Sequence, residues 1–150
     1  MKHPILFLLF AVSGISLLAQ DTTKSSIFNM EDGIMVQGYD IVSYFNEKPL
    51  EGKASITKRY KGATYQFHTE TNLTAFNANP EKYIPEFGGY CAYAMGARGE
   101  LVDIDPETYK IVNGKLYLFY NAYFNNTLKK WNKDETNLLK KANTNWKELL

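Results

Sequence analysis

The turn at Asn113-Gly114 constrains the fold of this chain more than any other local feature. Residues 109–112 before it and 115–119 after it are rich in strand-forming side chains. An Asn-Gly pair between two such runs predicts a two-residue type I′ β-hairpin. A similar alternation on either side of Lys61-Gly62 predicts a second hairpin over residues 55–67. The fold must therefore contain antiparallel strands.

Helical patterns alternate with these hairpins. Thr69 is a good N-cap for a helix that reaches about Ala78, and Asn79 before Pro80 predicts a short second helix. Three more helices are expected: one from Tyr90, one over residues 122–131, and one capped by Asn132 that buries Leu138, Ala142, Trp146 and Leu149. The mixed order of two hairpins and several short helices, without a repeat, predicts a small single domain of the α+β class.

The amino terminus has the parts of an export signal. Lys2 and His3 precede an uncharged apolar stretch, and Ala19 stands before polar Gln20. The stretch is short for a membrane anchor, which needs about 20 apolar residues, although an uncleaved anchor is the alternative. We expect residues 1–19 to be a cleaved signal peptide, 20–30 a flexible lead-in and 31–150 the domain. The mature protein would then be periplasmic or secreted.

Charge limits the classes of partner. The chain has a net charge of +1, and loss of Lys2 with the signal peptide would leave the mature protein near zero. Nucleic acids and anionic membranes select for clustered positive charge. We therefore expect no nucleic-acid partner and no membrane contact beyond the export signal.

Cys91 is the most informative single residue. It is the only cysteine, so no internal disulfide can form. Glycines precede it, and we expect it in the first turn of a short helix, where free N–H groups stabilise a thiolate. The loop predicts a ligand site with the members Gly88, Gly89, Tyr90, Cys91 and Tyr93. The alternative is that Cys91 is a small buried hydrophobe.

A metal site is a second possibility for the same thiol. Met95 follows Cys91 by four residues and would share its helix face. With His68, the one histidine outside the expected signal peptide, these residues would suit a soft ion such as a copper ion, Cu(I). No carboxylate pair or nucleophile–base set predicts a catalytic site, so a binding protein is favoured over an enzyme.

Several long motifs carry a family resemblance. They are residues 38–45 (GYDIVSYF), 79–83 (NPEKY), 88–94 (GGYCAYA), 111–118 (IVNGKLYL) and 142–146 (ANTNW), together with Lys130-Trp131. In this order they resemble the exported bacterial YHS-domain proteins. The resemblance implies a small α+β module of a group linked to heavy-metal handling, without a settled activity for the exported members.

The resemblance also implies where the cysteines of the metal-associated members would fall. These three positions are Ser43, His68 and Asn72 in this chain, so all three thiols are absent. Serine and asparagine are poor ligands for soft metals. Metal binding by the usual cysteines is therefore not expected here.

Three functions remain open at this point. The leading hypothesis is a non-enzymatic binding module for a soft metal ion or a small ligand at the Cys91 loop. The second is thiol redox chemistry with Cys91 as the nucleophile. The third is a structural or protein-interaction domain that uses its tyrosines as a contact surface.

Overall fold

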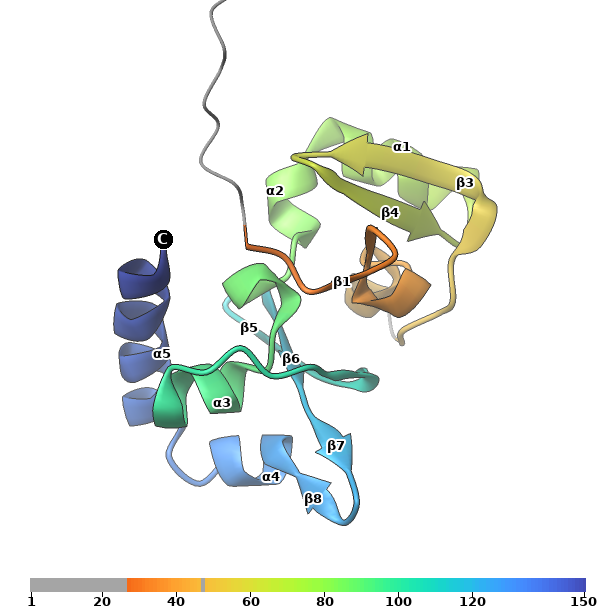
Figure 1. Ribbon diagram of the computed structural model, residues 1–150. Coiled ribbons are helices and arrows are strands. Elements are labelled where there is room, and N and C mark those ends of the chain that lie inside the picture. The colour runs from red at the N-terminus through yellow and green to blue at the C-terminus, as the bar shows by residue number, and fades with distance from the viewer. Residues whose placement is uncertain (1–26, 47) are drawn as a thin grey trace, which may run out of the picture.

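A computed structural model describes residues 27–46 and 48–150 of the chain (Figure 1). The expected signal peptide and residues 20–26 of the expected lead-in lie outside the described residues. Short strands and helices follow one another along the described part, which confirms the predicted α+β class.

The first half of the described chain forms a four-stranded sheet in the order β1-β2-β4-β3. Its strands are β1 (Met30–Glu31), β2 (Ile34–Met35), β3 (Lys53–Tyr60) and β4 (Ala63–Phe67). Strands β3 and β4 are antiparallel around Lys61-Gly62, as predicted. The short 3-10 helices η1 (Val36–Gly38) and η2 (Ser43–Phe45) connect β2 to β3.

Helix α1 (Glu70–Ala78) packs on the β3–β4 hairpin. The Thr69 side chain caps it by accepting the Asn72 N–H at 3.1 Å, which confirms the predicted cap. Phe76 has no exposed surface, and its ring centre lies 5.1 Å from that of Tyr65. Aromatic burial of this kind holds the helix against the sheet. Helix α2 (Pro80–Tyr83) follows, with Pro80 in its first turn.

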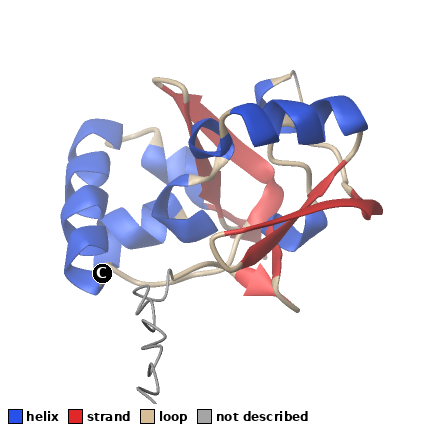
Figure 2. Ribbon diagram, turned by 90° about the horizontal axis from the view of Figure 1, so that it is seen from above, coloured by secondary structure: helices blue, strands red, loops and turns tan. Residues whose placement is uncertain are grey.

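The second half places helices around the predicted hairpin of β5 (Asp105–Val112) and β6 (Lys115–Phe119). Before it come η3 (Glu86–Gly89) and α3 (Ala92–Arg98), and after it α4 (Thr127–Trp131) and α5 (Glu135–Leu149). Seen from above (Figure 2), α5, which carries the C-terminus, lies at the opposite end of the molecule from the β3–β4 hairpin. Two packed clusters result, and Tyr93 contacts both.

The predicted helix over residues 122–131 is wrong in its first half. Strands β7 (Asn121–Ala122) and β8 (Asn125–Asn126) form a small hairpin there, and α4 begins only at Thr127. The chain reverses because Tyr123 and Phe124 both have positive φ angles, 50° and 61°. A helix cannot continue through two such residues.

Two details of the last helix also differ from the expectation. Asp134, not Asn132, is its N-cap residue. Ala142 is buried and Leu138 and Trp146 are partly buried, whereas Leu149 is exposed. The helical spacing therefore identified the inner face but extended it one turn too far.

Candidate functional site

Cys91 lies immediately before helix α3 and not in its first turn. It is the N-cap residue, because a bridge to Leu118 and a 2.9 Å hydrogen bond from its N–H to the Val102 carbonyl fix its backbone. The helix begins at Ala92, two residues later than predicted. The Cys91 side chain makes no capping bond to the helix, so the expected stabilisation of a thiolate by the free N–H groups is not found.

The polar partners of the thiol come from the segment after β6. The Tyr120 N–H donates to Cys91 Sγ at 3.4 Å, and Thr127 Oγ1 lies 3.4 Å from the same sulfur. Thr127 donates its one hydroxyl proton to the Tyr120 carbonyl at 2.8 Å. The Thr127 oxygen is therefore left to accept the S–H proton. Cys91 has no exposed surface, so its thiol is a buried and hydrogen-bonded group.

A pocket of about 240 Å³ lies beside this thiol. Its lining comes from α3, the loop before β5, and the segment from Tyr120 into α4. The lining residues are Cys91, Tyr93, Ala94, Arg98, Val102, Tyr120, Asn125, Thr127 and Lys130. We call this space the Cys91 pocket.

Two of these side chains give the Cys91 pocket a positive charge. The Nζ atom of Lys130 lies 5.9 Å from the ring centre of Tyr93. Arg98 donates from Nε to the Glu100 carboxylate at 2.6 Å, and this hydrogen bond raises the pKa of Arg98. The bond to Glu100 is made by Nε, and the two terminal amino groups of Arg98 carry further donors suited to an acidic group.

An unpaired acceptor also lines the pocket. The Oδ1 atom of Asn125 is buried and has no hydrogen-bond partner among residues 27–46 and 48–150. A buried amide oxygen without a donor is unfavourable. A ligand that supplies an N–H or O–H group would remove that cost.

The residues of the predicted ligand loop fall into two groups with different surroundings. Cys91 and Tyr93 line the pocket, whereas Gly88, Gly89 and Tyr90 hold the chain's own amino-terminal segment. Asn29 donates from its backbone to the Gly88 carbonyl at 2.8 Å and from its side chain to the Gly89 carbonyl at 3.2 Å. A Cβ on Gly88 would lie 2.1 Å from the Ile27 carbonyl oxygen. Close backbone approach explains that glycine.

The three expected metal ligands have separate surroundings. The His68 Nδ1 atom is hydrogen-bonded to the Glu51 carbonyl oxygen at 2.9 Å. Met95 is buried in the cluster of α3, α4 and α5, whereas Cys91 belongs to the other packed cluster. Within the described part of the chain, no group of three or more His, Cys, Asp or Glu side chains is arranged to hold a metal ion.

A second polar centre, which the sequence reasoning missed, surrounds Asp40. This carboxylate has no exposed surface. It accepts the N–H groups of Val42 at 2.9 Å, Ser43 at 3.3 Å and His68 at 2.8 Å, and the side-chain amide of Asn72 at 2.6 Å. The sequence feature that could have revealed this centre is the charged Asp40 beside the apolar pair Ile41-Val42. A charged residue next to core residues is buried only where its charge is paired.

Three of these four donors come from the positions where the resemblance places metal-binding cysteines. Ser43, His68 and Asn72 do converge, but each directs an N–H group at Asp40. N–H groups pointing inward bind an anion, and the carboxylate of Asp40 already serves as that anion. The residues present do not fit a heavy-metal ion at this place.

Comparison with known proteins places a family match on this part of the molecule. Residues 41–86 match the family model of the YHS domain, so the chain contains a YHS domain. The match covers η2, the β3–β4 hairpin, α1 and α2. No curated protein and no solved structure matches the chain. Among the described helices, none has the length and apolar character needed to span a bilayer.

Proposed function

We propose that this chain is an exported, non-enzymatic binding module that holds a small acidic ligand in the Cys91 pocket. The observation that carries the proposal is the pairing of two basic side chains, Arg98 and Lys130, with the unpaired Asn125 oxygen in one pocket. The YHS domain supplies the neighbouring half of the fold. The export part rests on the sequence pattern of residues 1–19.

The size of the pocket restricts the ligand. Its volume of about 240 Å³ is below the roughly 300–1,000 Å³ of pockets that take drug-sized molecules. The basic side chains favour a carboxylate, and the Asn125 oxygen favours a donor on the same molecule. A small hydroxy acid or amino acid combines both features.

A soft metal is not part of this proposal. The neighbours of Cys91 Sγ are a peptide N–H and a hydroxyl, which are not the nitrogen and sulfur ligands that soft ions prefer. Thiol redox chemistry is also less well supported, because reactive thiols are partly exposed, whereas Cys91 is fully buried.

Thermal unfolding of the mature protein tests the proposal, with L-lactate, L-alanine and acetate as probes. A ligand at about ten times its Kd stabilises the native state by roughly 1.4 kcal/mol, which raises the Tm by a few degrees. We expect lactate or alanine to give a larger shift than acetate, because acetate carries no donor for Asn125.

Matched variants separate the two halves of the site. Asn125→Ala should reduce the lactate or alanine shift to the acetate level, and Arg98→Gln with Lys130→Gln should abolish all shifts. Lys147→Gln, on the exposed part of α5, is the control for charge and should change nothing. Absence of any shift in the wild-type protein would contradict the proposal.

A further inference from the structure

Strand β3 is the outer strand on one side of the four-stranded sheet. The order β1-β2-β4-β3 gives it a single strand partner, β4. Hydrogen bonds of β4 show which backbone groups of β3 point outward. Thr64 of β4 donates its N–H away from β3, to the Gly33 carbonyl at 2.9 Å. Arg59 lies opposite Thr64, so this pair exchanges no hydrogen bonds, and the Arg59 N–H and carbonyl point out of the sheet.

The outer edge of β3 is open along residues 57–60. Pairing with β4 is regular there and is interrupted by a bulge only between Lys53 and Thr57. Thr57 presents its backbone to the same edge as Arg59, because strand geometry repeats every two residues, and both residues are exposed. No loop or helix backbone among residues 27–46 and 48–150 bonds to either of them. An open edge with outward donors and acceptors is suited to receive a strand from another chain.

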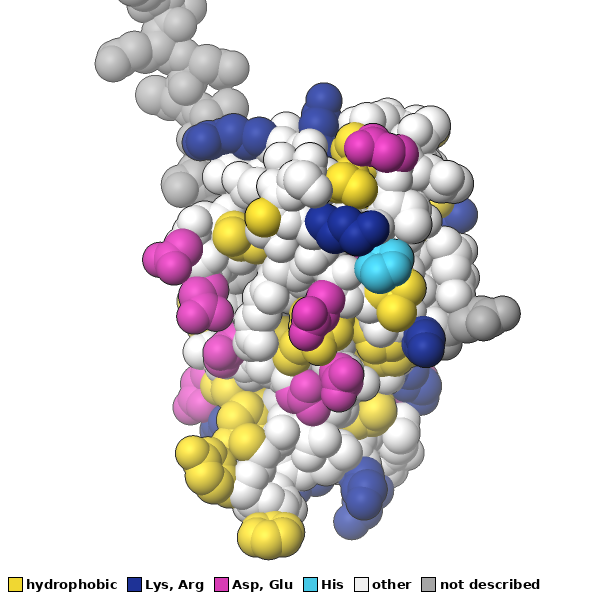
Figure 3. Space-filling model, turned by 90° about the vertical axis from the view of Figure 1, so that its right-hand side faces the viewer, with side chains coloured by type: hydrophobic (Ala, Val, Ile, Leu, Met, Phe, Trp, Pro, Cys, Tyr) yellow, Lys and Arg dark blue, Asp and Glu magenta, His cyan; other side chains and the backbone are white. Residues whose placement is uncertain are grey.

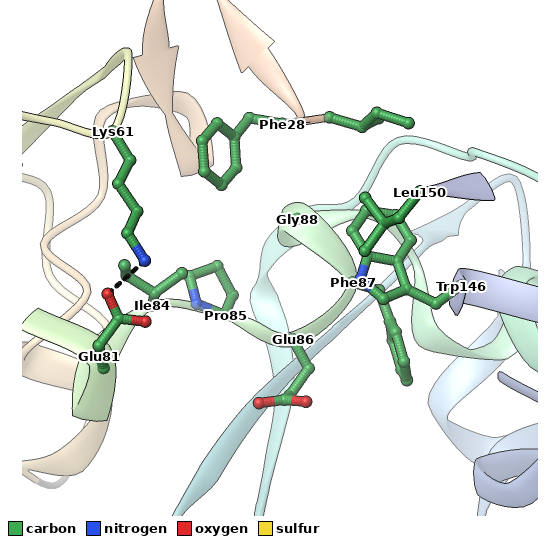
Figure 4. A pocket seen from close by; sticks show the side chains of 11 residues that line it. Phe28, Lys61, Glu81, Ile84, Pro85, Glu86, Phe87, Gly88, Trp146 and Leu150 are labelled. Atoms are coloured by element: carbon green, nitrogen blue, oxygen red, sulfur yellow. Dashed lines mark ion pairs between the residues drawn. The ribbon is translucent and has the colours of Figure 1, made fainter. Parts of the chain in front are cut away.

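The side chains along this edge are basic and carry positive charge that the chain itself does not neutralise. Lys53, Lys58 and Arg59 are exposed, and no ion pair joins any of them to a carboxylate in the described part of the chain. Lys61 in the adjacent turn differs, since its Nζ atom lies 2.6 Å from the Glu81 carboxylate (Figure 4). Basic side chains lie on the upper part of the face in Figure 3, the side on which Figure 1 shows β3.

The combination of free backbone groups and positive charge selects among partners. A second copy that paired through its own β3 would bring two sets of lysine and arginine side chains together, and like charges on facing strands are unfavourable. A nucleic acid would match the charge, but its phosphate oxygens accept hydrogen bonds and offer no donor to the outward carbonyls of Thr57 and Arg59. An extended acidic peptide supplies backbone donors, backbone acceptors and carboxylates together.

We propose that β3 binds an extended acidic segment of a partner protein, which adds to the sheet as a further strand along residues 57–60. The main chain of the segment bonds to the outward groups of Thr57 and Arg59. Lys58 and Arg59 are neighbours in a strand, so their side chains lie on opposite faces of the sheet. Two successive acidic residues of the partner therefore reach both side chains. The proposal goes beyond ligand binding in the Cys91 pocket and does not depend on it.

Amide NMR of the isotope-labelled mature protein tests the contact, with the peptide acetyl-Thr-Val-Glu-Glu-Val-Thr-amide as the probe. We expect the signals of residues 57–60 to shift as the peptide is added, and the Arg59 amide to become protected from hydrogen exchange, because its N–H gains a partner. A fully N-methylated form of the peptide keeps both carboxylates but has no backbone donor. This form should bind at least about tenfold more weakly, since strand addition depends on main-chain hydrogen bonds.

Charge reversal tests the side chains separately. The variant with Lys58→Glu and Arg59→Glu should bind the acidic peptide at least about tenfold more weakly than the wild type, because attraction becomes repulsion. The same variant should gain binding to acetyl-Thr-Val-Lys-Lys-Val-Thr-amide. The matched control carries Lys140→Glu and Lys141→Glu, which make the same charge change at two exposed positions of α5. The control should bind the acidic peptide as the wild type does.

Four results would overturn the proposal. The first is a wild-type protein whose spectrum does not change with the acidic peptide. The second is equal binding of the N-methylated peptide, which would reduce the contact to charge attraction without strand addition. The third is equal loss of binding in the α5 control, which would show that net charge and not β3 is responsible. The fourth is tighter binding of a single-stranded oligothymidylate at residues 57–60, which would make this edge a nucleic-acid contact.

Discussion

The side-chain amide of Asn72 donates a 2.6 Å hydrogen bond to Oδ2 of Asp40, across 32 positions of sequence. Asp40 precedes η2, and Asn72 is in the first turn of α1. The backbone N–H of His68, at the end of β4, reaches the same oxygen at 2.8 Å. One buried carboxylate therefore connects the loop before η2 to the sheet and to the helix of the YHS domain.

Replacing Asp40 by asparagine should destabilise the protein strongly. The new side-chain amide would present its own N–H groups to N–H donors that now bond to the Asp40 carboxylate. These buried donors would then lose their acceptor. We expect a loss of about 2–4 kcal/mol in the free energy of unfolding, measured by urea denaturation. Asp32→Asn, in an exposed turn that tolerates asparagine, should change stability by less than about 0.5 kcal/mol. Equal effects of the two substitutions would refute this function of Asp40.

Local chemistry predicted the parts of the fold that depend on neighbouring residues. The turns at Lys61-Gly62 and Asn113-Gly114 and the Thr69 cap all follow from short-range preferences. The β7–β8 hairpin was missed because Tyr123-Phe124 contains neither glycine nor asparagine, the residues that mark such turns. Its conformation opposes the local preference, so no local rule predicts it.

The candidate site was only partly predictable for a different reason. Cys91 and Tyr93 were identified from the glycine-bounded loop, but Thr127 and Tyr120, which bond the thiol, are 36 and 29 positions away. Asn125 and Lys130 belong to the same distant segment. Which residues share a pocket depends on the packing of α3 against the segment after β6. Local sequence patterns do not reveal that packing.

Tyr65 and Tyr44 form a matched pair for a second prediction. The Tyr65 hydroxyl is buried without a hydrogen-bond partner in the described part of the chain, whereas the Tyr44 hydroxyl donates to the Pro106 carbonyl at 2.6 Å. Tyr65→Phe removes an unsatisfied group and should leave stability unchanged or raise it by up to about 1 kcal/mol. Tyr44→Phe should cost about 1–2 kcal/mol. Urea denaturation distinguishes them, and a larger loss for Tyr65→Phe would be the contrary result.

Native Cys91 should react slowly with thiol reagents. The thiol has no exposed surface and bonds both Thr127 and Tyr120, so alkylation requires the structure to open. We expect iodoacetamide to label Cys91 in urea at least about a hundred times faster than in buffer, since opening is rare in a stable domain. Thr127→Val should accelerate the native reaction. Fast labelling of the wild-type native protein would instead support the thiol-redox hypothesis.

Gly96 should be intolerant of even one added methyl group. A Cβ at this position would lie 2.5 Å from the Leu138 carbonyl oxygen, because α3 and α5 pack backbone to backbone here. The Asn145 side chain adds a 2.7 Å hydrogen bond to the Met95 carbonyl. Gly96→Ala should therefore cost about 1–3 kcal/mol by overpacking, although alanine favours helices. Ala97→Ser, on the exposed face of the same helix, is the control, and thermal unfolding would show a lowered Tm only for Gly96→Ala.

Stability should fall at alkaline pH because buried tyrosines resist ionisation. Burial, with smaller contributions from Glu86 and Glu135, raises the pKa of Tyr117 to about 12, and burial also raises the pKa of Tyr65. The unfolded chain releases these protons near pH 10, so between about pH 10 and 12 it binds fewer protons than the native state. The free energy of unfolding then decreases as pH rises through this window and is undiminished below it. Urea denaturation at several pH values should show a shallower decrease for Tyr117→Phe, and parallel curves for the variant and the wild type would exclude this contribution.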